Sequence, residues 1–227
     1  MRAPDERPGP PGGVRDTRRR EVTARLAQEA LARFLVAGVE GVSIDEIASA
    51  AGVSKGSFYT YFDDKAELVG ALMHTVAEPV RGAMARCEAA LGEATSPEAL
   101  RGAYLELAGA LAAAILSEPG VVALYLQESR GPGVGARAPV VALAAEVHAR
   151  AVDLTRAARR HGLIKPLDPE VTAAAVVGAA EALIHRALTA PGNFDAGAVT
   201  EALVTMVIDG IAQGPKPAAP SAVQEAR

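Results

Sequence analysis

The stretch from Ser43 to Lys65 constrains the fold most, because it encodes two short helices joined by a tight turn. It reads SIDEIASAAGVSKGSFYTYFDDK. Ser43 can cap the first helix, and Glu46 three residues later completes a capping box. Gly52 suits the left-handed residue that often ends a helix, and Ser54 can cap the next helix. This succession predicts a helix-turn-helix unit.

The second of these helices has two distinct faces on a helical wheel. Phe58 and Phe62, with Tyr61, fall on the side that should pack inward. The opposite face is small and polar, as a helix that enters a major groove requires. Its glycine, Gly56, allows a close approach to DNA. The candidates for reading base edges are Lys55, Ser57 and Thr60.

Four segments with fixed spacing identify a family. They are a long first helix ending at Gly38, residues 44–48 (IDEIA), residues 52–62 (GVSKGSFYTYF) and residues 65–68 (KAEL). Over roughly residues 15–80 the chain resembles the tetracycline-repressor (TetR) family of bacterial transcription regulators. The resemblance implies an all-α homodimer with an N-terminal DNA-binding domain and a C-terminal helical bundle for ligand binding and dimerisation. Beyond residue 80, the helical architecture and the length fit the family.

The resemblance also implies contacts with DNA phosphates, from Ser43, Ser54, Tyr59, Tyr61 and Lys65. Each residue has a structural alternative. The two serines cap helices whether or not DNA is present, Tyr61 can belong to the core, and Lys65 can be an ordinary first-turn lysine. Asp45 departs from the expected face, because an acid there weakens any contact that the first short helix makes with DNA.

Arginines gather before the helix-turn-helix, although the whole chain carries a net charge of −4. Residues 14–25 hold five arginines against two acids, a local charge of +3. A basic cluster in this place favours phosphate contacts by an N-terminal arm, and Arg18 and Arg19 are the candidates. The alternative is a solvated start of the first helix.

Apolar periodicity and capping signals predict helices along the rest of the chain and no sheet. The expected helices cover residues 15–37, 64–91, 96–117, 121–129, 139–161, 169–189 and 195–212, besides the two short ones. Pro79 should kink the fourth helix or end its first segment. The predicted domains are a disordered tail (1–14), the DNA-binding domain (15–80), the ligand-binding and dimerisation domain (81–213) and a second disordered tail (214–227).

The middle helices should surround a pocket for an apolar or amphipathic effector, because few polar groups lie on their apolar stripes. Candidates for its wall are Tyr104, Leu107, Leu111, Tyr125, Leu126 and His148, although each also suits a plain core. The last two helices should form the dimer interface through Ala174, Gly178, Ala182, Leu203, Val207 and Ile211. These faces can alternatively belong to the intramolecular core.

Several functional classes are not expected. No apolar run is long and uncharged enough to indicate a membrane span, and the N-terminus lacks the apolar segment of a secretory signal. Cys87 is the single cysteine, which fits a reducing cytoplasm. The four histidines are dispersed, so no metal site is predicted. No nucleophile–base pair is visible, so we expect no catalytic site and no cofactor.

The sequence therefore predicts a cytoplasmic, DNA-binding regulator, a repressor that a small molecule releases from a pseudo-palindromic operator. Half-sites one turn apart, about 34–36 Å, require a dimer. Two alternatives stay open. One is an activator with the same DNA chemistry, and the other is a helical small-molecule-binding protein or enzyme with a vestigial helix-turn-helix.

Overall fold

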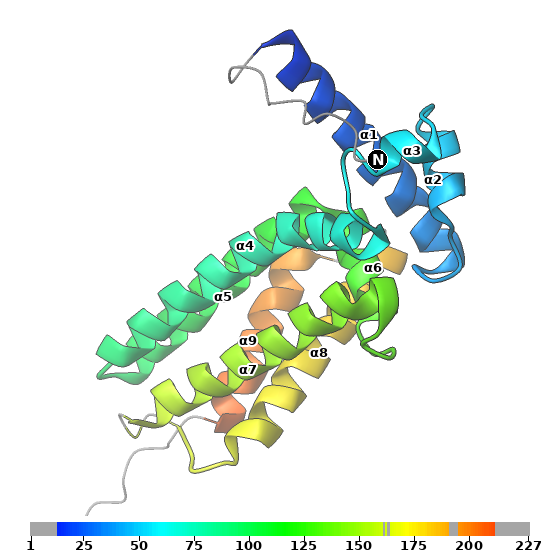
Figure 1. The fold of residues 1–227 in the computed structure, drawn as a ribbon. Helices are drawn as coiled ribbons and strands as arrows, with labels where there is room; N and C mark the ends of the chain where they lie inside the picture. The colour runs from blue at the N-terminus through cyan, green and yellow to red at the C-terminus, as the bar shows by residue number, and fades with distance from the viewer. Residues whose placement is uncertain (1–12, 161, 163, 191–194, 212–227) are drawn as a thin grey trace, which may run out of the picture.

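The computed structural model describes residues 13–211 except 161, 163 and 191–194, and this part of the chain is helical without a β-strand (Figure 1). The all-α prediction is therefore confirmed. The helices are α1 (Val14–Ala37), α2 (Ile44–Ala50), α3 (Lys55–Phe58), α4 (Lys65–Glu93), α5 (Pro97–Ser117), α6 (Pro119–Glu128), the 3₁₀ helix η1 (Gly135–Arg137), α7 (Ala138–Arg160), α8 (Pro169–Thr189) and α9 (Ala196–Ile211).

Helices α1, α2 and α3 form a small group at one end of the molecule, and the other helices form an elongated bundle (Figure 1). Leu26, Ala30 and Phe34 of α1 are fully buried, and their spacing of four residues places them on one face of the helix. Ser43 and Glu46 form the predicted capping box at the start of α2. Local signals therefore placed this group correctly.

Helix α3 is shorter than predicted. Its regular part ends at Phe58, whereas we expected the helix to extend to about Phe62. The amides of Thr60 and Tyr61 bond to carbonyls three residues back, at 3.0 and 2.9 Å, and Phe62 returns to the i−4 pattern at 3.1 Å. The turn thus continues to Phe62 with the tighter hydrogen bonds of a helix end.

Helix α4 runs through Pro79 without ending there, so the two groups of helices share one continuous element. It packs along both α5 and α7. A single buried cluster joins Phe34 and Phe58 of the first group to Val121 and Leu124 of α6. The proposed domain boundary at residue 80 therefore lies inside α4, and it stays a prediction.

The predicted tails lie almost entirely outside the described residues. Val14, the last residue assigned to the N-terminal tail, already begins α1. Residues 1–12 and 212–227 lie outside the described part of the chain.

Two helices differ from the expectation of no membrane-spanning segment. Helices α5 and α8 each have 21 residues, and their most apolar windows have a mean hydropathy of 1.4, which is enough to cross a membrane by length and composition. Two such helices are weak evidence of a membrane span, because core helices of soluble proteins pass the same test. Both helices contribute apolar side chains to the wall of a cavity.

Candidate functional site

The segment from Ser54 to Phe62 presents the residues expected to read DNA. The Ser54 hydroxyl accepts a hydrogen bond from the Ser57 amide at 3.1 Å, which fixes the start of α3. Phe58 is fully buried and Phe62 is 5 % exposed, so these two rings anchor the segment. Tyr59 lies edge-on against Phe58, with the ring centroids 5.6 Å apart, and remains 48 % exposed.

Gly56 is exposed, and nothing in the described protein requires a glycine there. A Cβ atom built on it would meet only the Ser54 hydroxyl, at 3.8 Å. Glycine lowers the stability of a helix by roughly 0.5–1 kcal/mol relative to alanine. A close approach by another molecule would explain this choice of residue.

Lys55 pairs with the acid that departs from the expected pattern. Its Nζ lies 2.8 Å from Asp45 Oδ2, and both side chains are more than half exposed. The hydrogen bond and the charge of Asp45 raise the pKa of Lys55. Lys55 must therefore break its ion pair with Asp45 to bind a base edge. Breaking an exposed ion pair of this kind costs little free energy.

Lys65 has a structural role that the sequence did not reveal. Its Nζ donates hydrogen bonds of 2.8 Å to the carbonyl oxygens of Val39 and Val42, in the turn between α1 and α2. The side chain is 16 % exposed, and Glu40 Oε2 lies 3.9 Å from the nitrogen. These two carbonyl oxygens stabilise the Lys65 cation, which lies at the positive, N-terminal end of the α4 dipole. Its position therefore requires no external anion.

Arg18 and Arg19 are exposed on α1. The Arg19 guanidinium lies over the ring of Tyr61, 5.8 Å from its centroid, within the range of a cation–π interaction. Tyr61 is half-buried. The contact joins α1 to the recognition segment, residues 54–62.

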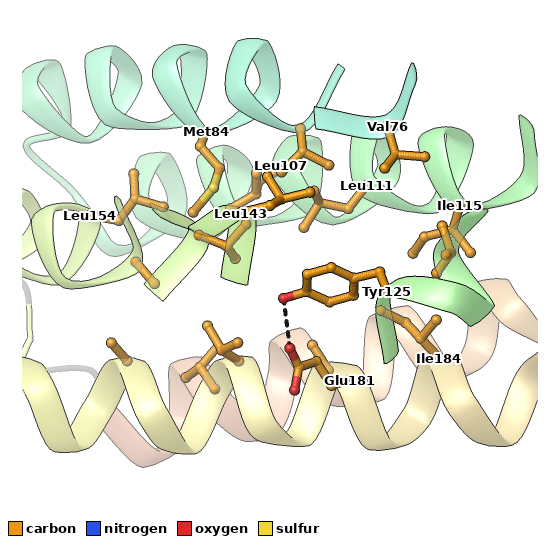
Figure 2. Close-up of a pocket in the computed structure, with 18 of the residues that line it drawn as sticks. Val76, Met84, Leu107, Leu111, Ile115, Tyr125, Leu143, Leu154, Glu181 and Ile184 are labelled. Carbon is orange, nitrogen blue, oxygen red and sulfur yellow. Dashed lines mark hydrogen bonds between the residues drawn. The ribbon is translucent and has the colours of Figure 1, made fainter. Parts of the chain in front are cut away.

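A cavity of about 210 Å³ lies between α4, α5, α6, α7, α8 and α9 (Figure 2). Five of the six residues that we expected in a pocket wall line it, namely Tyr104, Leu107, Leu111, Tyr125 and Leu126. His148 does not. It lies toward the start of α8, where its Nε2 is 3.2 Å from Glu170 Oε2, and its side chain is 38 % exposed.

Glu181 is the charged lining residue that sequence reasoning missed. Tyr125 donates a hydrogen bond of 2.9 Å to its Oε1 (Figure 2). Arg130 donates one of 3.2 Å to its Oε2. Burial, followed by the nearby carboxylate, raises the pKa of Tyr125. A sequence signal was present, because Glu181 is the one charged residue between positions 171 and 184.

A second buried acid, Glu128, connects helix α6 of the cavity wall to the segment after α1. It lies at the end of α6 and is 4 % exposed. Its Oε1 accepts a hydrogen bond of 3.0 Å from the Val39 amide, and its Oε2 accepts one from Arg137 Nε. Next to it, Gln127 Nε2 donates to the Phe34 carbonyl at 3.1 Å. Helix α6 thus contacts both the cavity and the end of α1.

The faces expected at a dimer interface are partly exposed. Ala174 and Ala182 are exposed on α8, and a Cβ atom on Gly178 would meet nothing within 4 Å. On α9, Leu203 is half-buried, whereas Val207 lines the cavity. The side chain of Ile211 lies outside the described part of the structure.

Residues 26–72 match the family model described as bacterial regulatory proteins, tetR family. The fold resembles NalD, the secondary repressor of the MexAB-OprM multidrug efflux pump in Pseudomonas aeruginosa, with 20% identity and a TM-score of 0.64 over 87% of this chain and 98% of that one. It also resembles SmeT in a complex with triclosan, with 18% identity and a TM-score of 0.64, over 88% and 99% of the two chains.

A third similar structure is FadR from Bacillus subtilis in complex with stearoyl-CoA, with 15% identity and a TM-score of 0.61 over 83% of this chain and 98% of that one. Residues 26–72 therefore form a tetR-family domain, and the chain as a whole has the fold of these three structures.

Glu128→Gln should lower the free energy of unfolding by about 2 kcal/mol or more, because the amide leaves the Arg137 cation without a charged partner. Burial would raise the pKa of Glu128, but hydrogen bonds from Arg137 and Val39 outweigh it and lower the pKa below the ordinary 4.5. A lowered pKa stabilises the fold above the unfolded-state value, and this contribution is lost as the pH falls through the folded-state value.

Denaturant unfolding of both proteins between pH 7 and pH 3 measures this difference. The deficit of the variant should be full at pH 7 and should shrink below about pH 4.5. Glu88→Gln removes an exposed carboxylate of α4 and is the matched control. Equal unfolding midpoints for Glu128→Gln and the unmodified protein at pH 7 would show that the buried contact does not stabilise the fold.

Proposed function

We propose that this protein is a sequence-specific transcriptional repressor that acts in the cytoplasm and binds a pseudo-palindromic operator in double-stranded DNA. A small apolar or amphipathic effector in the cavity releases it. The observation that carries this proposal is the exposed, polar face from Lys55 to Thr60, presented by a helix-turn-helix within a tetR-family domain.

Two sets of contacts with DNA are proposed. Lys55, Ser57 and Thr60 read base edges, which requires Lys55 to exchange Asp45 for a base acceptor. The set proposed to bind phosphates consists of Ser43, Ser54, Tyr59, Tyr61, Lys65, Arg18 and Arg19. Lys65 contributes least in this set, since two carbonyl groups already accept hydrogen bonds from it.

A homodimer is proposed because two recognition segments must reach successive major grooves. The exposed small residues of α8 suit close helix packing between protomers. Val171 of α8 is 69 % exposed and Met206 of α9 is 63 % exposed, so both helices present apolar side chains at the surface. These two helices are the proposed interface.

Release by an effector requires that the cavity and the DNA-binding helices share a moving part. Helix α6 meets this need, because Tyr125 and Leu126 line the cavity and Glu128 binds the Val39 amide after α1. An effector that binds more tightly to a conformer with a different position of α6 favours that conformer, and α1–α3 move with it. The equilibrium shifts by no more than the difference between the effector's binding free energies for the two conformers. The triclosan and stearoyl-CoA complexes of the similar structures support a ligand role for the cavity.

Selection of bound sequences from a random duplex pool, at near-physiological salt, tests the DNA-binding part. The purified protein should enrich a pseudo-palindrome with half-sites about one helical turn apart, as a symmetric dimer requires. No enrichment by protein shown to be folded would contradict the proposal and favour a binding or catalytic role for the C-terminal helices.

Gly56→Ala should separate stability from DNA binding. The added methyl group has space in the free protein, so the unfolding free energy should rise by up to about 1 kcal/mol. Affinity for the selected operator should fall about tenfold or more, about 1.4 kcal/mol, because the methyl group obstructs the close approach.

Gly102→Ala is the matched control, since Gly102 is exposed within α5 and a Cβ atom there would meet nothing within 4 Å. It should have the same small effect on stability and none on DNA affinity. Both measurements require an equilibrium titration of labelled duplex. Unchanged affinity in Gly56→Ala would remove Gly56 from the DNA interface.

A further inference from the structure

We propose that the cavity selects elongated apolar molecules that carry one protonated amine, and that Glu181 recognises this amine. The inference rests on the proposed function, because it names the chemical class of effector for the same cavity. Among the described residues that line the cavity, Glu181 is the one with a charged side chain. Its position therefore decides which polar group an effector can carry.

The other polar side chains of the wall are mostly committed to the protein itself. The Thr155 hydroxyl donates to the Ala151 carbonyl at 3.0 Å, and the Thr172 hydroxyl donates to the Asp168 carbonyl at 2.8 Å. Tyr125 donates its hydroxyl hydrogen to Glu181. Nearly all of the remaining wall is aliphatic, so the carboxylate is the strongest hydrogen-bonding group that an occupant meets.

The carboxylate keeps acceptor capacity for an additional donor. A carboxylate has about four lone-pair sites, and the described contacts of Glu181, with Tyr125 and Arg130, use two of them. Its side chain is 16 % exposed, whereas Arg130 is 77 % exposed. The negative charge is thus mostly buried, and its cationic partner lies largely in water, where an ion pair contributes little.

This arrangement favours a cation over an anion. An ammonium group beside Glu181 gains a charge-assisted hydrogen bond in a mostly apolar environment. A carboxylate or phosphate in the same place would meet a like charge. Arg130, which could offset that charge, is not among the residues that line the cavity.

The cavity is elongated and carries its charge at one place in the wall. The lining residues extend from Met84 and Leu154 at one end to Ile115 and Ile184 at the other, and the Glu181 carboxylate lies beside Tyr125, between these two ends (Figure 2). A linear alkyl chain can therefore occupy the aliphatic part while its amine reaches the carboxylate. Such a ligand would contact α6 directly through Tyr125.

Three ten-carbon probes with different end groups test this selection, namely decylamine, decanol and decanoate. The dissociation constant of each is measured by titration calorimetry with the full-length protein and with Glu181→Gln, which keeps the shape and an acceptor oxygen. Decylamine should bind the unmodified protein more tightly than either other probe. Its dissociation constant should rise about tenfold or more in Glu181→Gln, because a hydrogen bond to a charged group is lost.

Decanol should bind both proteins within about twofold of each other, since its alkyl chain meets the same wall. Glu88→Gln, which removes an exposed carboxylate of α4, controls for non-specific attraction of amines to an acidic protein and should leave decylamine binding unchanged. Tighter binding of decanoate than of decylamine to the unmodified protein would overturn the inference. Equal decylamine binding to Glu181→Gln, or no binding of any probe, would do the same.

The selected operator separates this inference from the proposed function. Decylamine that binds through Glu181 but leaves the protein on its operator would sustain the ligand class and contradict release by an effector. Release of DNA by decanol or decanoate, with weaker binding of decylamine, would sustain the regulator and overturn the amine preference.

Discussion

The buried carboxylate of Glu128 joins two parts of the molecule that the chain itself connects only through α4. It lies at the end of α6 and accepts hydrogen bonds from the Val39 amide, 89 residues earlier, and from Arg137. Because a buried charge is costly without partners, this acid holds the end of α1, the end of α6 and η1 in one arrangement. The position of α1–α3 relative to the cavity depends on that contact.

The bundle around the cavity is held by α4. Arg81 of α4 binds Glu146 of α7 through two hydrogen bonds, of 2.8 and 2.6 Å, and this pairing is the first cause that lowers the pKa of Glu146 to about 2. Lys65, at the other end of α4, binds the turn after α1. Helix α4 is therefore fixed to the DNA-binding helices at its start and to the bundle in its middle, and α6 provides a second connection.

Local sequence signals predicted the helices well, and long-range contacts explain what they missed. Ser43, Ser54 and Asp64 each cap a helix through the amide three positions later, so their pattern is visible in the sequence. Periodicity also found five residues of the cavity wall. The Val39 partner of Glu128 lies 89 residues away, and the Tyr125 partner of Glu181 lies 56 residues away, so no local pattern reveals them. Periodicity also does not show that His148 lies outside the cavity wall or that Val207 lines it.

The distance between the two recognition segments of a dimer tests most directly whether the cavity controls DNA binding. A spin label on Thr60→Cys reports it, since Thr60 is exposed, whereas Cys87 is buried, which raises its pKa to about 12 and leaves it inert to labelling. Without ligand, double electron–electron resonance should give one main distance of about 34–36 Å between the labels of the two protomers. An effector that releases the unlabelled protein from DNA should shift this distance. The absence of any such distance, or an unchanged distance with that effector bound, would contradict the coupling through α6.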